Sequence, residues 1–285
     1  MVSVKINDNN YYLKTSFTEF TEKELKIVCY HRSMNMNSES LDQLQFNAVR
    51  IALFKLLSNV PMSLIHKITS AQWVDILPFL NYCFKAPDFK TNPFPKLLVG
   101  LHTYVGPIGM LDKCSIEEMS QADTAFVACS NGKEPDKMYL LVALLYRPVR
   151  TDLQEFKASK EWNGDVREPF NAEKCKARVD KFKRLPPFMA IAVFLYYYSF
   201  RENKLMKFTR VFKKATENKP DTGTNRGWAG TLLEMAHLPV FGKLDEIILQ
   251  NWFTVVYEMD RQLEIKEKQE QEIERQRMHN ASQKR

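Results

Sequence analysis

Residues 185–200 read LPPFMAIAVFLYYYSF and carry no charged side chain. Because apolar residues occupy every side of a helix drawn through this stretch, it predicts a helix buried inside the protein. Pro186 and Pro187 favour a start there, since the first helical turn does not use their missing N–H groups. The alternative is a membrane span, but the run is shorter than the about 20 residues needed, and three tyrosines follow one another near its end. We therefore expect a core helix and no membrane span.

Length and composition indicate a globular protein. The chain has 285 residues, 45% of them hydrophobic, which is enough to bury a large core in one domain or two. Its formal net charge of +7 permits an anionic partner without requiring one. Nine glycines are few for a chain of this length and argue against a nucleotide-binding α/β fold with Gly-rich loops.

The N-terminal third combines a hairpin with short helices. Val2, Val4 and Ile6 alternate with polar residues before a turn at 8–10, which predicts a β-hairpin. Thr21 and Glu24 match a capping box ahead of an apolar run, so a helix is expected to begin there. Helical periodicity continues over 41–57, 61–68 and 70–84, with Ser70 as the expected cap of the last. Strands are expected at 96–99 and 102–105, and their pairing with the N-terminal hairpin stays open.

The remainder reads as helical. Helices are predicted over 115–131, 138–146, 205–215 and 244–259, with a surface loop at 151–168 and an exposed charged helical extension over 261–285. The predicted fold class is mainly α, a compact multi-helix domain with a small N-terminal β-hairpin. The expected organisation is an N-terminal hairpin and helical subdomain at 1–110, a helical core domain at 111–260 and a charged helical C-terminal tail at 261–285.

No catalytic or metal-binding motif is present in the sequence. The five cysteines are scattered without a CxxC pair, which favours reduced thiols, and residues 1–10 contain no secretory signal pattern. The five histidines lie far apart, and the spacing of Cys29 and His31 is no zinc signature. P-loop and G-x-S-x-G motifs are absent. We therefore predict a non-enzymatic protein without cofactor or metal; a helical enzyme with a site assembled in three dimensions remains an alternative.

Three stretches are candidate interaction surfaces. Trp162, the one large apolar residue of the predicted loop, either anchors an interface or folds back onto its own domain. The second stretch is the basic helix expected over 201–214. The third is the extension after Arg261, whose two heptads at most are too few for a coiled coil. The candidate residues are Trp162, Arg201, Lys204, Lys207, Arg210, Lys213, Lys214, Arg261, Ile265 and Ile273.

Several runs carry a resemblance to a known class of proteins. The opening 4–25, the run 144–148 (LLYRP), the run 167–170 (REPF) and the segment 227–236 are similar to stretches of tail-region proteins of tailed bacteriophages with Bacteroidetes-type hosts. The resemblance touches most of the chain and implies a tail assembly chaperone or a virion structural protein that binds other phage proteins. It implies no catalytic residues. The chain is much longer than the small assembly chaperones, which keeps the structural role open.

The functional prediction is a protein–protein interaction component of a tailed phage, acting in tail assembly or within the virion. Its expected partners are other phage structural or tail proteins, with self-association open, and its expected location is the host cytoplasm during assembly or the virion. The alternative is a nucleic-acid-binding protein that uses the basic faces at 174–184 and 201–214. Phosphate-driven binding weakens steeply with salt, whereas an apolar protein interface does not, so the two hypotheses are separable.

Overall fold

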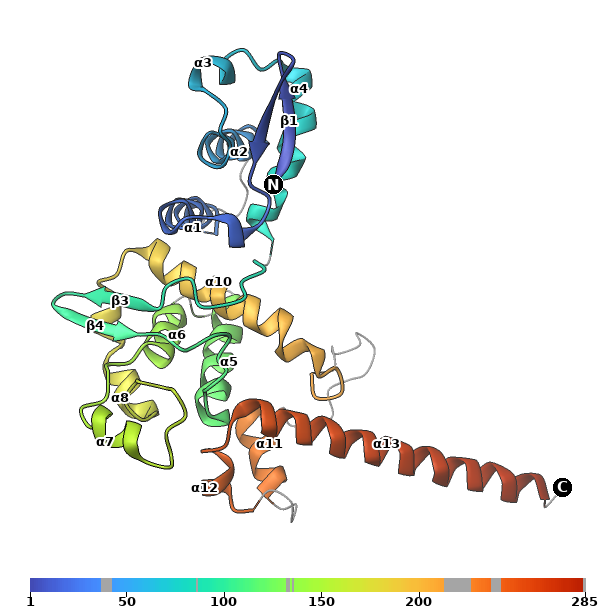
Figure 1. Cartoon of the computed structure of the whole chain (residues 1–285). Coiled ribbons are helices and arrows are strands. Elements are labelled where there is room, and N and C mark those ends of the chain that lie inside the picture. Colours follow the sequence, from blue (N-terminus) through green and yellow to red (C-terminus); the bar gives the residue numbers. More distant parts are fainter. Residues whose placement is uncertain are drawn as a thin grey trace.

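The computed structural model describes residues 1–36, 43–85, 87–131, 134, 136–212, 227–236 and 242–283. Within them the chain forms thirteen α-helices, three 3₁₀ segments and two small antiparallel sheets, which confirms the mainly α class with an N-terminal hairpin. Figure 1 shows an N-terminal lobe above a helical body, and a last helix that leaves the body.

Helix α10 (Pro187–Asn203) is the centre of the body and confirms the predicted core helix. Pro186 stands before it in an extended conformation, and from Ala190 to Phe200 only Tyr198 is not buried. Helices α1 (Glu22–Met36), α5 (Ile116–Ser130) and α6 (Lys137–Leu145) pack around it (Figure 1). A helix that is apolar on every side is thus covered on several sides by other helices.

The N-terminal lobe begins with the hairpin of β1 (Val2–Ile6) and β2 (Asn9–Leu13). Asn7 and Asp8 form its two-residue turn with φ of 49° and 65°, so the turn lies earlier than the 8–10 expected from the sequence. Positive φ at both turn residues matches the twist of the strands, and Asn and Asp tolerate it. A short 3₁₀ turn, η1 (Phe17–Glu19), leads to α1, where Thr21 and Glu24 form the predicted capping box.

Helices α2 (Gln43–Leu57), α3 (Met62–Ile65) and α4 (Ser70–Ile76) complete this lobe with the 3₁₀ segment η2 (Leu77–Phe84). Thr69, and not Ser70, caps α4, because its hydroxyl accepts from the Gln72 N–H while the Gln72 side chain accepts from the Thr69 N–H. Pro78 stands at the start of η2, where the α-helical pattern ends.

A second hairpin joins the lobe to the body. β3 (Lys96–Val99) and β4 (His102–Val105) pair with each other in a sheet separate from the first hairpin. In addition to its pairing within the hairpin, Val105 exchanges two backbone hydrogen bonds with Arg147, at 2.8 and 3.0 Å. The sheet is therefore attached to the chain that follows α6.

Three short helices lie between α6 and α10: α7 (Leu153–Ala158), α8 (Ala172–Ala177) and α9 (Val179–Phe182). Helix α7 corrects the expectation of an irregular loop over 151–168. Its Phe156 lies beneath the Arg150 guanidinium, 3.4 Å from the ring centroid, and this contact holds the short helix to the chain before it.

The chain after α10 differs from the prediction. The expected basic helix over 205–215 is wrong for its described part, because only the 3₁₀ segment η3 (Leu205–Lys207) forms, followed by hydrogen-bonded turns up to residue 212. Helix α11 (Gly227–Ala236) and α12 (Leu244–Ile247) follow, and then α13 (Trp252–Gln283). Helix α13 unites the end of the expected helix 244–259 with the expected helical extension.

The buried hydrophobic side chains form one cluster that runs from the N-terminal hairpin to the start of α13. The boundaries expected at 110 and 260 stay predictions. Among the described helices, none is both long enough and apolar enough to cross a bilayer.

Candidate interaction surfaces and a buried ionic network

A four-residue ionic network lies inside the body, and sequence reasoning missed it. Glu118 on α5 accepts from Arg147 Nη2 at 2.8 Å and from Arg167 Nη1 at 2.7 Å. Asp165 accepts from Arg167 Nη2 at 2.7 Å. Glu118, Arg147 and Arg167 are each 2% exposed, so their charges compensate one another away from water.

Backbone pairing sets the positions of the two arginines. Val149 and Arg167 form an antiparallel bridge, and the Glu168 N–H donates to the Pro148 carbonyl at 2.8 Å. The Arg147 guanidinium also lies over the Phe170 ring, 5.4 Å from its centroid. The runs 144–148 and 167–170, quoted above for the phage resemblance, are thus in direct contact.

Electrostatics favour the charged forms of two members of this network, Asp165 and Arg167. Burial raises the pKa of Asp165, but hydrogen bonds from Arg167 and its charge outweigh burial, and the net pKa lies below its usual range. For Arg167, burial opposes the charged form, and the neighbouring Glu118 holds its pKa well above its usual range. The thiol of Cys114 lies 3.5 Å from Arg167 Nη2, and burial raises its pKa far enough to keep it protonated.

This chemistry favours a structural role for the network. Burial disfavours the thiolate of Cys114, and the charged atoms that a substrate would have to reach are covered. The network joins α5, the segment after α6 and the segment before α8 to one another. Of the described residues, no group of three His, Cys, Asp or Glu side chains is arranged to hold a metal ion.

A second polar contact joins α5, α10 and α11. Asp123 accepts from Arg201 Nε at 3.0 Å and from Trp228 Nε1 at 3.1 Å, and Tyr197 Oη lies 3.4 Å away. Arg201, predicted to belong to an interaction surface, is therefore engaged inside the protein. Its side chain keeps 23% exposure.

Of the other predicted basic residues, one is bound within the protein, two are exposed and two lie outside the described residues. Arg210 is bound to α13, with Nη1 at 3.2 Å from Asp260 and Nε at 3.2 Å from Glu267. Lys204 and Lys207 are exposed. Lys213 and Lys214 lie outside the described residues. The structure thus does not place the four described members, Arg201, Lys204, Lys207 and Arg210, on one helical face, because α10 ends at Asn203.

Three of the six basic side chains in the run 174–184 pair with acids of the same chain. Arg178 pairs with Glu168, Lys176 with Glu173 at 2.7 Å, and Lys183 with Asp180 at 3.0 Å. Pairing of this kind lowers the positive potential that a phosphate backbone would meet.

Trp162 is 37% exposed and packs by an edge contact on Phe156, with ring centroids 5.4 Å apart. Of the two interpretations offered by the sequence, the contact with its own domain is the one observed. The outer part of the indole stays accessible.

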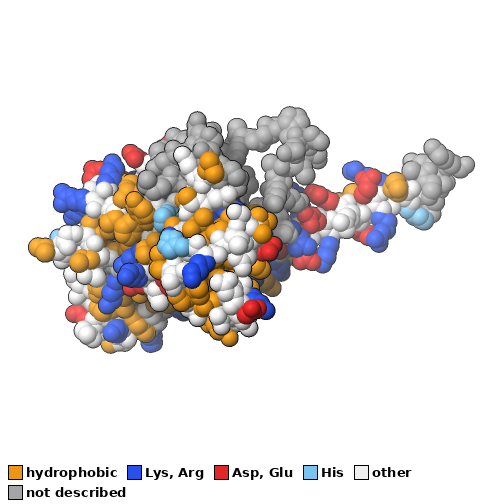
Figure 2. All heavy atoms as spheres, turned by 90° about the horizontal axis from the view of Figure 1, so that it is seen from above, with side chains coloured by type: hydrophobic (Ala, Val, Ile, Leu, Met, Phe, Trp, Pro, Cys, Tyr) orange, Lys and Arg blue, Asp and Glu red, His pale blue; other side chains and the backbone are white. Residues whose placement is uncertain are grey.

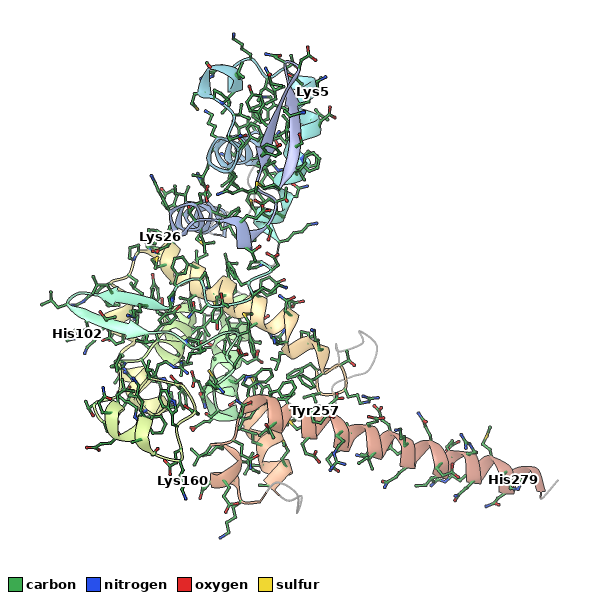
Figure 3. All side chains as sticks on the ribbon, in the orientation of Figure 1. Lys5, Lys26, His102, Lys160, Tyr257 and His279 are labelled. Carbon is green, nitrogen blue, oxygen red and sulfur yellow. The ribbon has the colours of Figure 1, made fainter. Side chains whose placement is uncertain are left out.

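The candidate residues of the C-terminal extension lie on α13, which runs on from the body without a break (Figure 1). Figure 3 follows this helix from Tyr257 near the body to His279 near its far end. Arg261 donates to Glu258 one turn earlier, at 2.6 and 2.8 Å. Ile265 is 37% exposed and Ile273 is 50% exposed, without an apolar neighbour on the next turn. This helix carries the predicted surface that the structure leaves most accessible.

Sequence reasoning also missed an apolar hairpin tip. Gly100, with φ of 61°, turns β3 into β4, and the following Leu101 is 97% exposed. Leu98 on the outer face of β3 is 69% exposed. Figure 2 shows hydrophobic side chains distributed over the upper face of the molecule, between charged ones. A leucine after a turn glycine is the sequence signal that indicates this tip.

Comparison of the chain with protein-family models, with curated proteins and with solved structures gave no match.

Proposed function

We propose that this chain is a non-enzymatic protein that works by binding other proteins, as a component of tailed-bacteriophage assembly or of the phage particle. The observation that carries the proposal is α13, a 32-residue helix whose outer part projects from the body with every residue of 271–280 exposed. An isolated polar helix gains little from its own hydrogen bonds, and such a helix is suited to lie against a partner.

The distribution of charge supports a protein partner over nucleic acid. Arg201, Arg210 and Arg178 each bind a carboxylate of this chain, so much of the basic charge expected to meet phosphates is already compensated. The outer part of α13 carries as many acids as bases over 271–280, Glu272 and Glu274 against Arg275 and Arg277, so it offers no net positive charge to a phosphate backbone.

The phage assignment rests on the resemblance of four segments. Two of them, 144–148 and 167–170, contribute Arg147 and Arg167 to the buried network, so they hold the fold together. The expected partners are therefore tail or capsid proteins, met in the host cytoplasm or in the virion.

A tagged pull-down from infected-cell lysate, split into nuclease-treated and untreated halves, tests this proposal. Mass spectrometry is expected to find tail or capsid proteins in both halves. Capture of nucleic acid and its usual binding proteins alone, lost on digestion, would contradict it and favour the nucleic-acid alternative.

A further inference from the structure

One face of α13 has a symmetry that the rest of the helix lacks. At about 100° per residue, Gln262, Ile265, Ile273 and Gln276 all lie within about 40° of Gln269. Ile265 stands four residues before Gln269 and Ile273 four residues after it, each about 6 Å away along the axis. Gln262 and Gln276 are likewise equidistant, seven residues to either side. The order of residue types along this face, Gln, Ile, Gln, Ile, Gln, is therefore the same in both directions.

The body contacts the opposite side of this helix. Arg210 binds Asp260 and Glu267 and lies 4.0 Å from Glu264, and these three acids point about 140–180° away from Gln269. The accessible isoleucines, 37% and 50% exposed, are on the other side. Arg210 therefore fixes which face of the helix the protein presents.

We propose that this face binds a second copy of the same chain, with the two α13 helices antiparallel and a two-fold axis passing beside Gln269. Such an interface is isologous: where one residue contacts a second residue of the partner, the two-fold axis repeats that contact with the roles of the two chains exchanged. Ile265 of one copy lies level with Ile273 of the other, which gives two apolar layers, and the two Gln269 side chains meet at the centre. The inference rests on the proposed contact role of α13 and names the partner.

Charged residues beside this face select the antiparallel direction. Lys266 and Glu270 follow one edge of the face, and Lys268 and Glu272 follow the other. In an antiparallel pair, each edge of one helix lies beside the same edge of the other helix. Lys266 of one copy then meets Glu270 of the other, and Lys268 meets Glu272, with each pair about 3 Å apart along the axis. In a parallel pair, each edge of one helix lies beside the opposite edge of the other helix. Lys266 of one copy then meets Lys268 of the other, and Glu270 meets Glu272. The like-charge contacts disfavour the parallel pair.

Two isoleucines from each copy bury little apolar area, so the association is expected to depend on concentration. This expectation decides the kind of experiment. A covalent trap at the symmetry axis detects a weak complex that a dilute hydrodynamic measurement would miss.

Disulfide trapping in the purified full-length protein tests the proposal. Gln269→Cys is expected to form a disulfide-linked dimer under mild oxidation, because two cysteines at the axis come within bonding distance. Gln271→Cys, on the far side of the same helix, and the wild-type chain with its five native cysteines are the controls and are expected to stay largely monomeric. Adding Ile265→Glu and Ile273→Glu to Gln269→Cys is expected to reduce dimer formation to the level of Gln271→Cys.

A mixing experiment fixes the direction. Gln262→Cys and Gln276→Cys are each expected to form no disulfide-linked dimer alone. When the two variants are mixed, they are expected to cross-link with each other. Cross-linking of each variant with itself would show a parallel pair, and equal cross-linking of Gln269→Cys and Gln271→Cys would show random collision; either overturns the proposal. Because only purified protein is used, failure here leaves the lysate pull-down free to succeed with other partners.

Discussion

Arg167 donates to both carboxylate oxygens of Glu118, at 2.7 and 3.3 Å, although 49 residues separate them in the chain. The same carboxylate accepts from Arg147, so one acid on α5 binds two arginines on two other segments. Asp165 supplies the second negative charge. The buried network thereby contains two positive and two negative groups, and removal of one leaves its partners uncompensated.

Glu118→Gln is expected to destabilise the protein by about 3 kcal/mol, because the change leaves two buried guanidinium groups with a single anionic partner. Urea unfolding followed by circular dichroism measures the loss. Glu117→Gln, one position earlier and partly exposed, is the matched control and is expected to change the free energy of unfolding by less than about 0.5 kcal/mol. Equal losses in the two variants would contradict the role given to the network.

Asp165 is expected to make the free energy of unfolding depend on pH. Its pKa is lower in the folded protein than its ordinary value of 3.8, so the unfolded chain takes up the proton first. The stabilisation is complete well above pH 3.8 and is lost as the pH falls below about 5 toward the folded pKa. Comparison of urea midpoints at pH 7 and pH 4 tests this. Asp165→Asn is expected to lose less stability over that interval than the wild type, and an equal or larger loss would contradict the assignment.

The cysteines are expected to differ in reactivity. Burial raises the pKa of Cys29 to about 12 and that of Cys83 to about 11, and it raises the pKa of Cys114 well above its ordinary range. Cys129 is the half-buried member and is expected to react first with iodoacetamide at neutral pH, since alkylation needs an accessible thiolate. Peptide mass spectrometry over time gives the order. Alkylation of Cys114 as fast as that of Cys129 in the native protein would contradict the packing around Arg167.

The contact between Asp123 and Arg201 is expected to stabilise the protein. A double-mutant cycle with Asp123→Asn and Arg201→Gln should give a coupling free energy of about 1–2 kcal/mol, since Asp123 is largely buried and hydrogen bonds to a charged donor are strong. The exposed pair Glu22 and Lys26 on α1 is the control and should show a much smaller coupling. A coupling near zero at Asp123 would favour the sequence interpretation of Arg201 as a surface residue.

Local patterns were sufficient to predict the central helix and the starts of α1 and α5, whereas the cap of α4 is Thr69 and not the expected Ser70. The apolar run 185–200 has no polar side, so burial follows from the sequence without knowledge of its neighbours. Ser115 caps α5 and Thr21 caps α1 as their spacing predicts, because a cap depends on residues only three positions apart.

The buried network could not be predicted in the same way. Arg147, Arg167 and Glu118 are ordinary surface residue types, and their pairing depends on contacts between distant segments. One local signal was available: Arg147 follows directly on the apolar run 138–146, which places a charge at the end of a buried helix. The basic helix expected at 205–215 failed for the same reason, since Arg210 is held by acids of α13 that lie about 50 residues later.

The claim that this chain works through protein contacts of α13 is tested most directly by comparing what variants of that helix capture. Three tagged proteins are incubated with nuclease-treated lysate, and captured proteins are quantified by mass spectrometry. They are the wild type, Ile265→Glu with Ile273→Glu, and the charge-matched control Gln271→Glu with Met278→Glu, whose two positions lie on the far side of the helix from Gln269. The account predicts that wild type and control retain the same phage proteins and that the isoleucine variant loses them about tenfold or more, as expected for 1.4 kcal/mol of lost contact. Undiminished capture by the isoleucine variant would contradict it.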